Sequence, residues 1–261
     1  MKISFIGAGN MGSAIIGGIV KACIAESQDI TVSDRDMDKL NSIKSQYNVN
    51  ITDNNLNCLP CDMLFLCVKP NVIYNVIDEI KSMVDENTMV VSIAAGQSIE
   101  KMTNAFGKSV KIVRVMPNTP ALVGEGMAAV SLGENVTNAD AVLEIFNSIG
   151  KAQVVPESLM DTVTAVSGSS PAYVFMLIEA MADAAASEGM DKEMAYTFAA
   201  QSVFGSAKMV METDISPVQL KENVCSPGGT TIEAVAVFEK EDLHGMVGRA
   251  MKACSDKSRR M

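Results

Sequence analysis

The sequence predicts an α/β domain built on a mostly parallel sheet, followed by an all-α domain. Two observations carry this prediction. Up to about residue 155, short apolar segments rich in β-branched residues alternate with helical patterns, which is typical of parallel strands joined by helices. After Pro156 no strand candidate follows, and helical patterns fill the chain. We therefore divide the chain into residues 1–156 and residues 157–261.

Short apolar runs give the strands of the first part. They are Ile3–Ile6, Ile30–Ser33, Met63–Val68, Met89–Ile93, Lys111–Met116, Met127–Val130 and Gln153–Val155. The second part contains residues that typically start or stop helices. Helix starts are expected at Ser170-Pro171, Asp191 and Ser216-Pro217, and a stop at Gly189. Two further helices are expected over residues 230–239 and 242–255.

The helix expected over residues 172–188 is apolar on nearly every side. Only Glu179 and Asp183 interrupt it before its last residues. A helix that is apolar all round must be buried all round, and residues 157–261 leave little room for that within one subunit. We therefore expect a homodimer or a higher homo-oligomer formed by this part of the chain.

Composition excludes several classes of partner. Among 261 residues, Lys and Arg number 21 and Asp and Glu 31, so the net charge of −10 argues against nucleic acid and anionic membranes. We expect no membrane partner, because no signal peptide or apolar run of spanning length appears. Six scattered cysteines fit reduced thiols in a cytoplasmic protein. Cys58 and Cys61 have redox-motif spacing without its context, and a single His makes a His-based metal site improbable.

A glycine-rich turn follows the first strand and opens a helix. Gly7-x-Gly9-x-x-Gly12 fits a tight turn at Gly7, close approach of a pyrophosphate at Gly9, and helix–strand packing at Gly12. The N–H groups at the helix start would face the phosphates. A second strand then ends at Asp34. This combination predicts a Rossmann-type dinucleotide-binding domain.

The segment Ser33-Asp34-Arg35 leaves the choice of cofactor open. Asp34 suits the ribose 2′-hydroxyl of NADH and would repel the 2′-phosphate of NADPH. Arg35 could pair with that phosphate, and Ser33 could hydrogen-bond it. The sequence favours NADH slightly, and both cofactors stay possible.

Three further turns are expected at the carboxyl ends of strands, where ligands of parallel sheets bind. They are Val68-Lys69-Pro70, Ala94-Ala95-Gly96 and the turn over residues 117–120. Small residues in the second turn would let a nicotinamide lie close to the backbone.

A second glycine-containing loop, "NVCSPGGTTIEAV", lies in the helical part. Thr230-x-x-Glu233 fits a capping box, with Thr230 as the capping residue and Thr231 as the first helical residue. Gly228 and Gly229 leave the approach to the helix start open. The free N–H groups and the helix dipole predict a site for a small carboxylate.

Six segments occur in an order and spacing that resemble the pyrroline-5-carboxylate reductases over essentially the whole chain: "FIGAGNMGSAI", "CVKP", "SIAAG", "RVMPNTPA", "GSSPAYVF" and "CSPGGTTIEA". The resemblance implies an α/β Rossmann-type N-terminal domain followed by an all-α dimerisation domain. It also implies reduction of 1-pyrroline-5-carboxylate to L-proline by NADPH or NADH, the final step of proline biosynthesis.

The resemblance also implies site residues. The cofactor contacts would be Ile6, Gly7, Ala8, Gly9, Asn10, Met11, Ser33, Asp34, Arg35, Asn55, Val68, Lys69, Pro70 and Ala95. The substrate contacts would be Asn223, Ser226, Gly229, Thr230 and Thr231, with Glu157 a weaker candidate. Thr231 is the expected catalytic residue, because its hydroxyl could hydrogen-bond the ring nitrogen. An imine can bind already protonated, so no strong acid is needed.

Three other functions compete with this one. A 3-hydroxyacid dehydrogenase-like reductase would place a catalytic Lys on the first long helix of the second part, but no Lys or Arg occurs between Lys151 and Lys192. A reductase of six-membered cyclic imines stays open. A dinucleotide-sensing regulator without catalysis would not need the second loop.

Overall fold

The computed structural model describes residues 1–261 and contains two compact units. The first unit comprises Met1–Ser169 together with Cys254–Met261, and the second comprises Ser170–Ala253. The predicted division after residue 156 differs from this one in two ways. Residues 157–169 lie with the first unit, and the last helix of the chain ends in that unit again.

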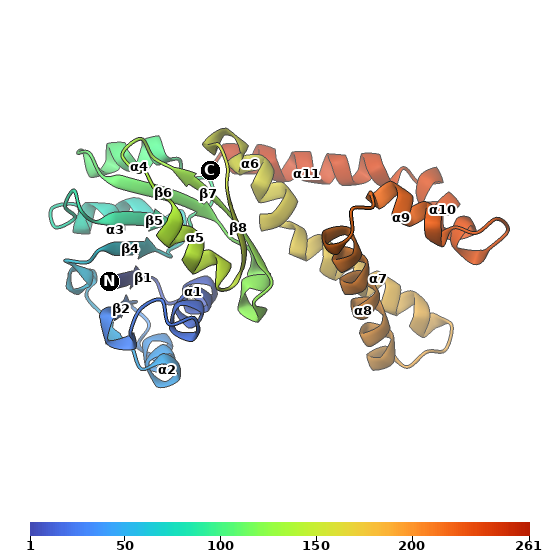
Figure 1. Cartoon of the computed structure of the whole chain (residues 1–261), viewed down its shortest axis with the longest axis horizontal. Coiled ribbons are helices and arrows are strands. Elements are labelled where there is room, and N and C mark those ends of the chain that lie inside the picture. Colours follow the sequence, from blue (N-terminus) through green and yellow to red (C-terminus); the bar gives the residue numbers. More distant parts are fainter. The chain divides into compact units, whose positions relative to one another are not determined.

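An eight-stranded sheet forms the centre of the first unit, with strand order β3-β2-β1-β4-β5-β6-β7-β8 (Figure 1). Neighbouring strands are parallel except β6 and β7, which are antiparallel. The predicted mostly parallel sheet is therefore confirmed. The strands are β1 Ile3–Ile6, β2 Ile30–Ser33, β3 Asn50–Thr52, β4 Met63–Leu66, β5 Met89–Ser92, β6 Lys111–Met116, β7 Gly126–Leu132 and β8 Gly150–Val154.

Helices cover both faces of this sheet. They are α1 Asn10–Lys21, α2 Met37–Tyr47, α3 Ile73–Ile80, α4 Ile99–Phe106 and α5 Asp140–Asn147, and the single turn α6 Met160–Val163 follows β8. Phe5 and Phe65 lie in the core beneath α1, α2 and α5, whereas Leu64 and Leu66 lie in the core beneath α3 and α4. Alternate residues of one strand thus enter opposite cores, which explains why the strand sequences are apolar throughout.

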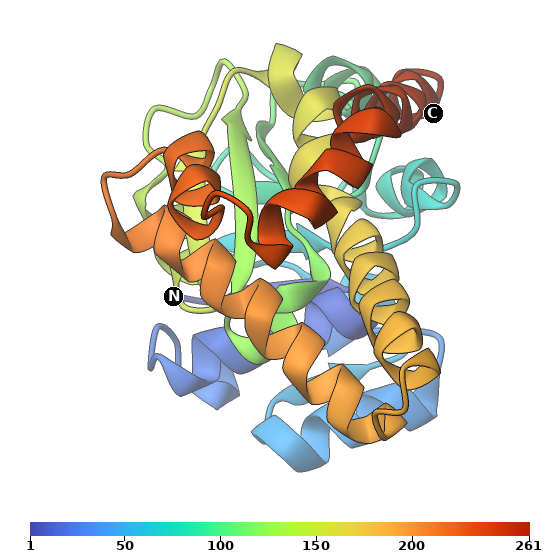
Figure 2. The same ribbon diagram turned by 90° about the vertical axis from the view of Figure 1, so that its right-hand side faces the viewer.

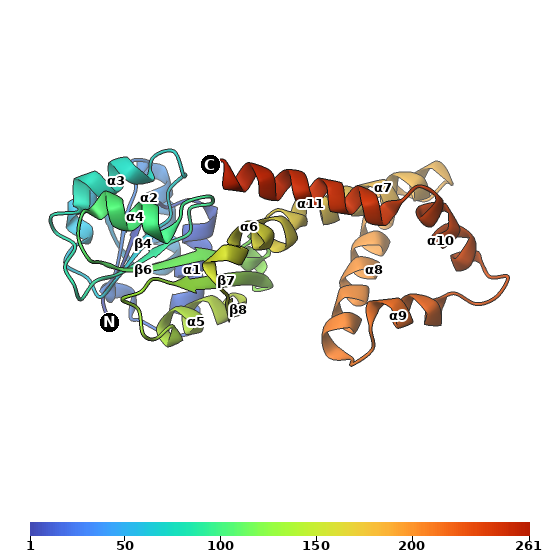
Figure 3. The ribbon, with the colours of Figure 1, turned by 90° about the horizontal axis from the view of Figure 1, so that it is seen from above.

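The second unit contains helices only. They are α7 Ser170–Ser187, α8 Lys192–Glu212, α9 Pro217–Val224, α10 Thr230–Lys240 and most of α11 Leu243–Arg259. The connection around Gly189 joins α7 and α8 (Figure 2), and α9 and α10 lead from α8 to the long α11 (Figure 3). None of the helices combines the length and apolar character that a membrane-spanning segment needs.

Three of the predicted helix signals of this unit are confirmed, and α7 begins at Ser170 shortly after a π-helical segment, Thr164–Gly168. The Asp191 carboxylate accepts a hydrogen bond from the Met194 N–H, and the Ser216 hydroxyl accepts one from the Gln219 N–H. Both satisfy backbone donors that a helix start leaves unpaired. Gly189 has φ +98°, a left-handed conformation that ends α7 and that residues with a side chain rarely adopt.

Candidate active site

The glycine loop between β1 and α1 has the geometry that its three glycines predict. Gly7 has φ +109°, and a Cβ there would collide with the Cys67 carbonyl. A Cβ on Gly12 would lie 2.6 Å from the Gly7 carbonyl oxygen, so close packing of helix and loop requires glycine. At Gly9, by contrast, a Cβ would meet nothing within 4 Å. Gly9 therefore faces open space, as close approach of a ligand requires.

The start of α1 offers unpaired backbone donors next to this open space. Gly9 is the N-cap residue, no side chain caps the helix, and its first turn contains no acidic residue. Free N–H groups and the positive end of the helix dipole together favour an anion. The loop can therefore hold a phosphate group.

Asp34, at the carboxyl end of β2, binds the glycine loop. Its Oδ2 accepts a hydrogen bond of 2.7 Å from the Ala8 N–H, and its Oδ1 accepts one of 2.9 Å from the Asp36 N–H. Both carboxylate oxygens thus have backbone partners, and the Ala8 N–H points at Asp34. Arg35 beside it forms no ion pair in the structure.

A cleft of about 220 Å³ lies beside the loop and brings together seven of the predicted cofactor residues. These are Ile6, Gly7, Ser33, Asp34, Arg35, Asn55 and Val68. The cleft is smaller than the usual pocket for a drug-sized ligand, so it can take one part of a dinucleotide. Its position at the ends of β1 and β2 is where the adenosine ribose of a Rossmann-type domain lies.

Sequence reasoning missed one wall of this cleft, formed by α3 and the residue before it. Val72, Asn75, Val76 and Glu79 line the cleft from that side. The spacing of Asn75 and Glu79, four residues apart on one helix, is the signal that could have indicated a polar face there. Glu79 Oε2 accepts a hydrogen bond of 2.9 Å from Asn55 Nδ2, and Asn55 Oδ1 accepts one of 2.8 Å from the Ser33 hydroxyl.

A side-chain hydrogen bond connects the segments that follow two of the predicted turns, the turn at residues 68–70 and the turn at residues 94–96. Tyr74 follows the predicted turn at Val68-Lys69-Pro70, and its hydroxyl donates to Gln97 Oε1 at 2.5 Å. Partial burial raises the pKa of Tyr74, which keeps this phenol protonated and able to donate. Gln97 is buried and follows the predicted turn at Ala94-Ala95-Gly96.

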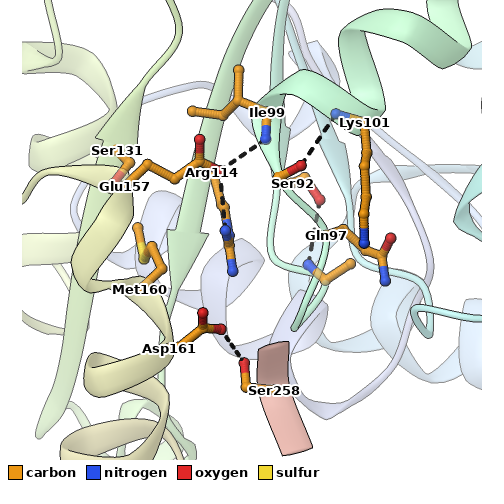
Figure 4. A network of polar contacts seen from close by, with 12 residues as sticks. Ser92, Gln97, Ile99, Lys101, Arg114, Ser131, Glu157, Met160, Asp161 and Ser258 are labelled. Atoms are coloured by element: carbon orange, nitrogen blue, oxygen red, sulfur yellow. Dashed lines mark hydrogen bonds and ion pairs between the residues drawn. The ribbon is translucent and has the colours of Figure 1, made fainter. Parts of the chain in front are cut away.

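The turn at Gly96 is also in contact with the end of the chain. Gly96 has φ +72°, and a Cβ there would lie 2.5 Å from the Cβ of Met261 and 3.1 Å from the Ser258 carbonyl. The Ser258 hydroxyl donates to Asp161 Oδ1 at 2.6 Å (Figure 4). The last residues of α11 are therefore part of the first unit. No sequence pattern indicated this contact.

Glu157 holds a buried arginine in place. Its Oε1 accepts hydrogen bonds from Arg114 Nη1 at 3.0 Å and from the Ile99 N–H at 2.8 Å (Figure 4). The Arg114 side chain is only 9% exposed, so its charge needs this partner. Glu157 thus has a structural role in the first unit. Its contact with substrate, implied by the resemblance, stays a prediction.

The predicted capping box at the second loop is wrong. Helix α10 begins at Thr230 with Gly229 as its N-cap, at φ −83° and ψ 170°, and no side chain caps it. Gly228 is left-handed, at φ +70°, and turns the chain into the helix one residue earlier than predicted. Thr230 is therefore already helical, and its hydroxyl does not accept from the Glu233 N–H.

This correction changes what the loop offers a ligand. The hydroxyls of Thr230 and Thr231 form no hydrogen bond within the chain, and the first N–H groups of α10 lack a side-chain partner. The Gly229 N–H donates to the Ser226 carbonyl at 3.0 Å, which closes the turn before the helix. A carboxylate at this helix start would meet free N–H groups and two free hydroxyls.

Asn223 is placed near the end of α9. Its Oδ1 accepts from Gln219 Nε2 at 3.1 Å. An ion pair of 3.2 Å between Lys221 and Glu239 connects α9 to α10. The predicted substrate residues of the second loop, 223–231, thus form one turn between two connected helices. Glu157 alone lies in the other unit.

Family models match both parts of the chain. Residues 2–96 match the model described as NADP oxidoreductase coenzyme F420-dependent, and residues 157–261 match the model of pyrroline-5-carboxylate reductase dimerisation. The pyrroline-5-carboxylate reductase of Escherichia coli K12 is 46% identical over all of this chain and 98% of its own length. This chain belongs to the pyrroline-5-carboxylate reductase family. The Methanosarcina acetivorans reductase is 41% identical over all of this chain and 97% of its own length.

Solved structures of the family support the same conclusion. The reductase of Coxiella burnetii has a TM-score of 0.91 and 35% identity, covering 99% of this chain and 97% of that one. The Plasmodium falciparum reductase, solved with NADP bound, has a TM-score of 0.90 and 35% identity, covering 100% of this chain and 97% of that one. Family membership makes the chain an oxidoreductase and confirms the Rossmann-type domain followed by a helical dimerisation domain.

Proposed function

We propose that this chain reduces 1-pyrroline-5-carboxylate to L-proline with NADH or NADPH, the final step of proline biosynthesis. The observation that carries the proposal is the 46% identity to a reductase of that name over the whole chain. The likeness includes both loops that the reaction needs, one for a dinucleotide and one for a small carboxylate. It also disfavours a regulator without catalysis, which would not need the second loop.

The first unit would bind the cofactor, and its residues fit one. Open space at Gly9 and unpaired N–H groups at the start of α1 suit the pyrophosphate, and the cleft beside Asp34 suits the adenosine ribose. Bound NADH or NADPH supplies a hydride to the imine carbon. The proposed contacts are Ile6, Gly7, Ala8, Gly9, Asn10, Met11, Ser33, Asp34, Arg35, Asn55, Val68, Lys69, Pro70 and Ala95.

Ser33 would act indirectly within this set. Its side chain is completely buried, and its hydroxyl donates to Asn55. Ser33 therefore orients the Asn55 amide, and its own hydroxyl is already used in that hydrogen bond.

The second unit would bind the substrate at the start of α10. Free N–H groups there hold the substrate carboxylate, and the Thr231 hydroxyl hydrogen-bonds the ring nitrogen. The imine arrives with its nitrogen protonated, so the chain orients the substrate and need not donate a proton from a strong acid. The proposed substrate contacts are Asn223, Ser226, Gly229, Thr230, Thr231 and, in the first unit, Glu157.

Two neighbouring threonines allow a matched test of the catalytic role. Neither hydroxyl caps α10, so Thr230→Ala and Thr231→Ala each remove one free hydroxyl without removing a helix cap. We expect Thr231→Ala to lower kcat about 10- to 100-fold, the usual effect of losing one transition-state hydrogen bond, and to leave residual activity. Thr230→Ala should mainly raise KM. Unchanged kinetics in Thr231→Ala would contradict the role of Thr231.

The decisive experiment uses the purified protein with 1-pyrroline-5-carboxylate and either NADH or NADPH, followed by the loss of reduced cofactor absorbance. We expect oxidation of at least one cofactor and formation of proline. The six-membered cyclic imino acid serves as the comparison substrate. A higher kcat/KM on the six-membered ring would favour the alternative reductase, and no oxidation with either ring would overturn the proposal.

Residues 1–156 would thus serve the cofactor, and residues 157–261 the substrate and dimerisation. A homodimer or higher homo-oligomer is supported by the match of residues 157–261 to the family's dimerisation model. Exposed apolar side chains on α7 and α8 support it too, with Phe175, Met176 and Phe198 each more than half exposed. A cytoplasmic location is supported by the six free cysteines, which suit a reducing compartment. The net charge of −10 supports the absence of a nucleic-acid partner.

A further inference from the structure

We infer that Glu79 of α3 is a determinant of cofactor choice that favours NADH over NADPH. The inference rests on the proposed function, because it concerns the cofactor of that reaction. Four observations lead to it: the backbone hydrogen bonds that Asp34 accepts, the position of Glu79, the hydrogen bonds that hold Glu79, and the charges around the cleft.

Asp34 is the residue that would ordinarily bind the ribose 2′-hydroxyl. Here its two oxygens accept from the Ala8 and Asp36 N–H groups at 2.7 and 2.9 Å. Those bonds fix the glycine loop to the end of β2 and turn the carboxylate toward the backbone. Both Asp34 oxygens therefore already accept a backbone hydrogen bond, whereas a carboxylate with an unpaired oxygen in the same cleft could accept from the ribose more directly.

Glu79 meets this requirement. It lines the same cleft as Gly7, Ser33 and Asp34, and it reaches the cleft from the opposite element, α3. Its Oε2 accepts from Asn55, whereas its Oε1 has no partner in the chain. One carboxylate oxygen is thus anchored and the other is free to accept a hydrogen bond from a ligand.

The hydrogen bonds of Glu79, Asn55 and Ser33 determine which polar atoms this wall of the cleft offers to a ligand. A carboxylate can only accept, so the Asn55 amide nitrogen faces Glu79 and the Asn55 oxygen faces Ser33. The buried Ser33 hydroxyl donates to that oxygen and completes the chain. Glu79 therefore holds Asn55 in this orientation with one oxygen and keeps its other oxygen, Oε1, as an unpaired acceptor at the cleft.

That acceptor distinguishes the two cofactors. The ribose of NADH has a 2′-hydroxyl that can donate to Glu79. The 2′-phosphate of NADPH carries negative charge and only acceptor oxygens, so Glu79 and Asp34 both repel it. Arg35 is the one cation lining the cleft. Two carboxylates against one guanidinium leave the cleft unfavourable for the phosphate.

The test measures equilibrium binding of NAD⁺ and NADP⁺ to the full-length protein by titration calorimetry. Glu79→Gln keeps the shape of the side chain and removes its charge. We expect the ratio Kd(NADP⁺)/Kd(NAD⁺) to fall at least about fivefold, the effect of removing one unfavourable charge contact near the surface. Glu79→Ala should shift the ratio in the same direction. This second variant shows that the shift does not come from new hydrogen bonds made by the glutamine amide.

Asp78→Asn is the matched control. It removes one negative charge from the adjacent position of α3, where Asp78 is exposed and pairs with Lys81. Its ratio should stay within about twofold of the wild-type ratio. An unchanged ratio in both Glu79 variants, or an equal shift in Asp78→Asn, would overturn the inference. Normal nucleotide binding without turnover of 1-pyrroline-5-carboxylate would instead overturn the proposed function.

Discussion

Glu157→Ala is the substitution that best separates a structural role of Glu157 from a role in binding substrate. The wild-type carboxylate oxygen Oε1 serves both Arg114 Nη1 and the Ile99 N–H. Removing it leaves a nearly buried guanidinium without its ion-pair partner and a backbone donor of α4 without an acceptor. Both losses lower the free energy of unfolding and involve no ligand.

The size of the effect follows from burial. Breaking a buried ion pair costs about 3–5 kcal/mol, and leaving a backbone N–H unpaired costs about 1–3 kcal/mol. The Arg114 side chain is 9% exposed and Glu157 is 32% exposed, so water can partly solvate the site that the substitution opens. We therefore expect Glu157→Ala to lower the free energy of unfolding by about 3 kcal/mol, which is less than the sum of the two losses because water partly replaces the missing carboxylate. Glu157→Gln keeps an oxygen for the Ile99 N–H and should lose about half as much.

Urea unfolding at a single protein concentration measures this effect, because the stability of an oligomer depends on concentration. Glu134→Ala is the control, since Glu134 is exposed, lines a shallow surface cleft together with Glu157 and forms no ion pair. Its free energy of unfolding should stay within about 0.5 kcal/mol of wild type. A stable Glu157→Ala variant with a strongly raised KM for substrate would refute the structural reasoning and favour a substrate contact.

Three further outcomes are expected. Gly9→Ala should fold like the wild type, because its Cβ would meet nothing within 4 Å, yet bind NAD⁺ at least about tenfold more weakly. Gly12→Ala should instead lower the melting temperature, because its Cβ would collide with the backbone of Gly7. Phe198→Glu should shift the protein toward monomers in sedimentation velocity, since Phe198 is 64% exposed in the single chain; an unchanged mass would place the interface elsewhere. Burial raises the pKa of the Cys58 thiol from 9.0 to about 12, so unfolding releases a proton above pH 9 and stability should fall from pH 9 to 12. Urea unfolding at pH 8 and pH 10 should show a smaller fall in Cys58→Ala.

The sequence was most informative where strands are buried on both faces. Phe5 and Phe65 belong to one core and Leu64 and Leu66 to the other, which gives continuous apolar runs that are easy to recognise. The strand β3 at Asn50–Thr52 was missed because it is a short, polar edge strand without apolar periodicity. The antiparallel pairing of β6 with β7 has no local signature either, because it is set by the turn between them.

The candidate site was predictable where a motif is local. Within six residues the glycine loop combines a positive φ at Gly7, an open approach at Gly9 and a close contact between helix and loop at Gly12, and these leave a readable pattern. The error at Thr230 arose because one left-handed glycine, Gly228, shifts the start of α10 by a residue, and sequence alone leaves the conformation of two adjacent glycines open. The contacts of Glu79 with Asn55 and of Ser258 with Asp161 could not be predicted, because they join segments far apart in the chain.

The return of the last residues of α11 to the first unit has a consequence for how the protein is synthesised. The sheet and its helices, up to Ser169, leave the ribosome early, but Ser258 and Met261 follow only after the second unit has been made. Until then, Asp161 lacks its hydroxyl partner and the turn at Gly96 lacks the neighbour that covers it. Folding of the cofactor-binding unit during translation is therefore completed last. In a fragment that stops at residue 169, the turn at Gly96 would stay without this neighbour.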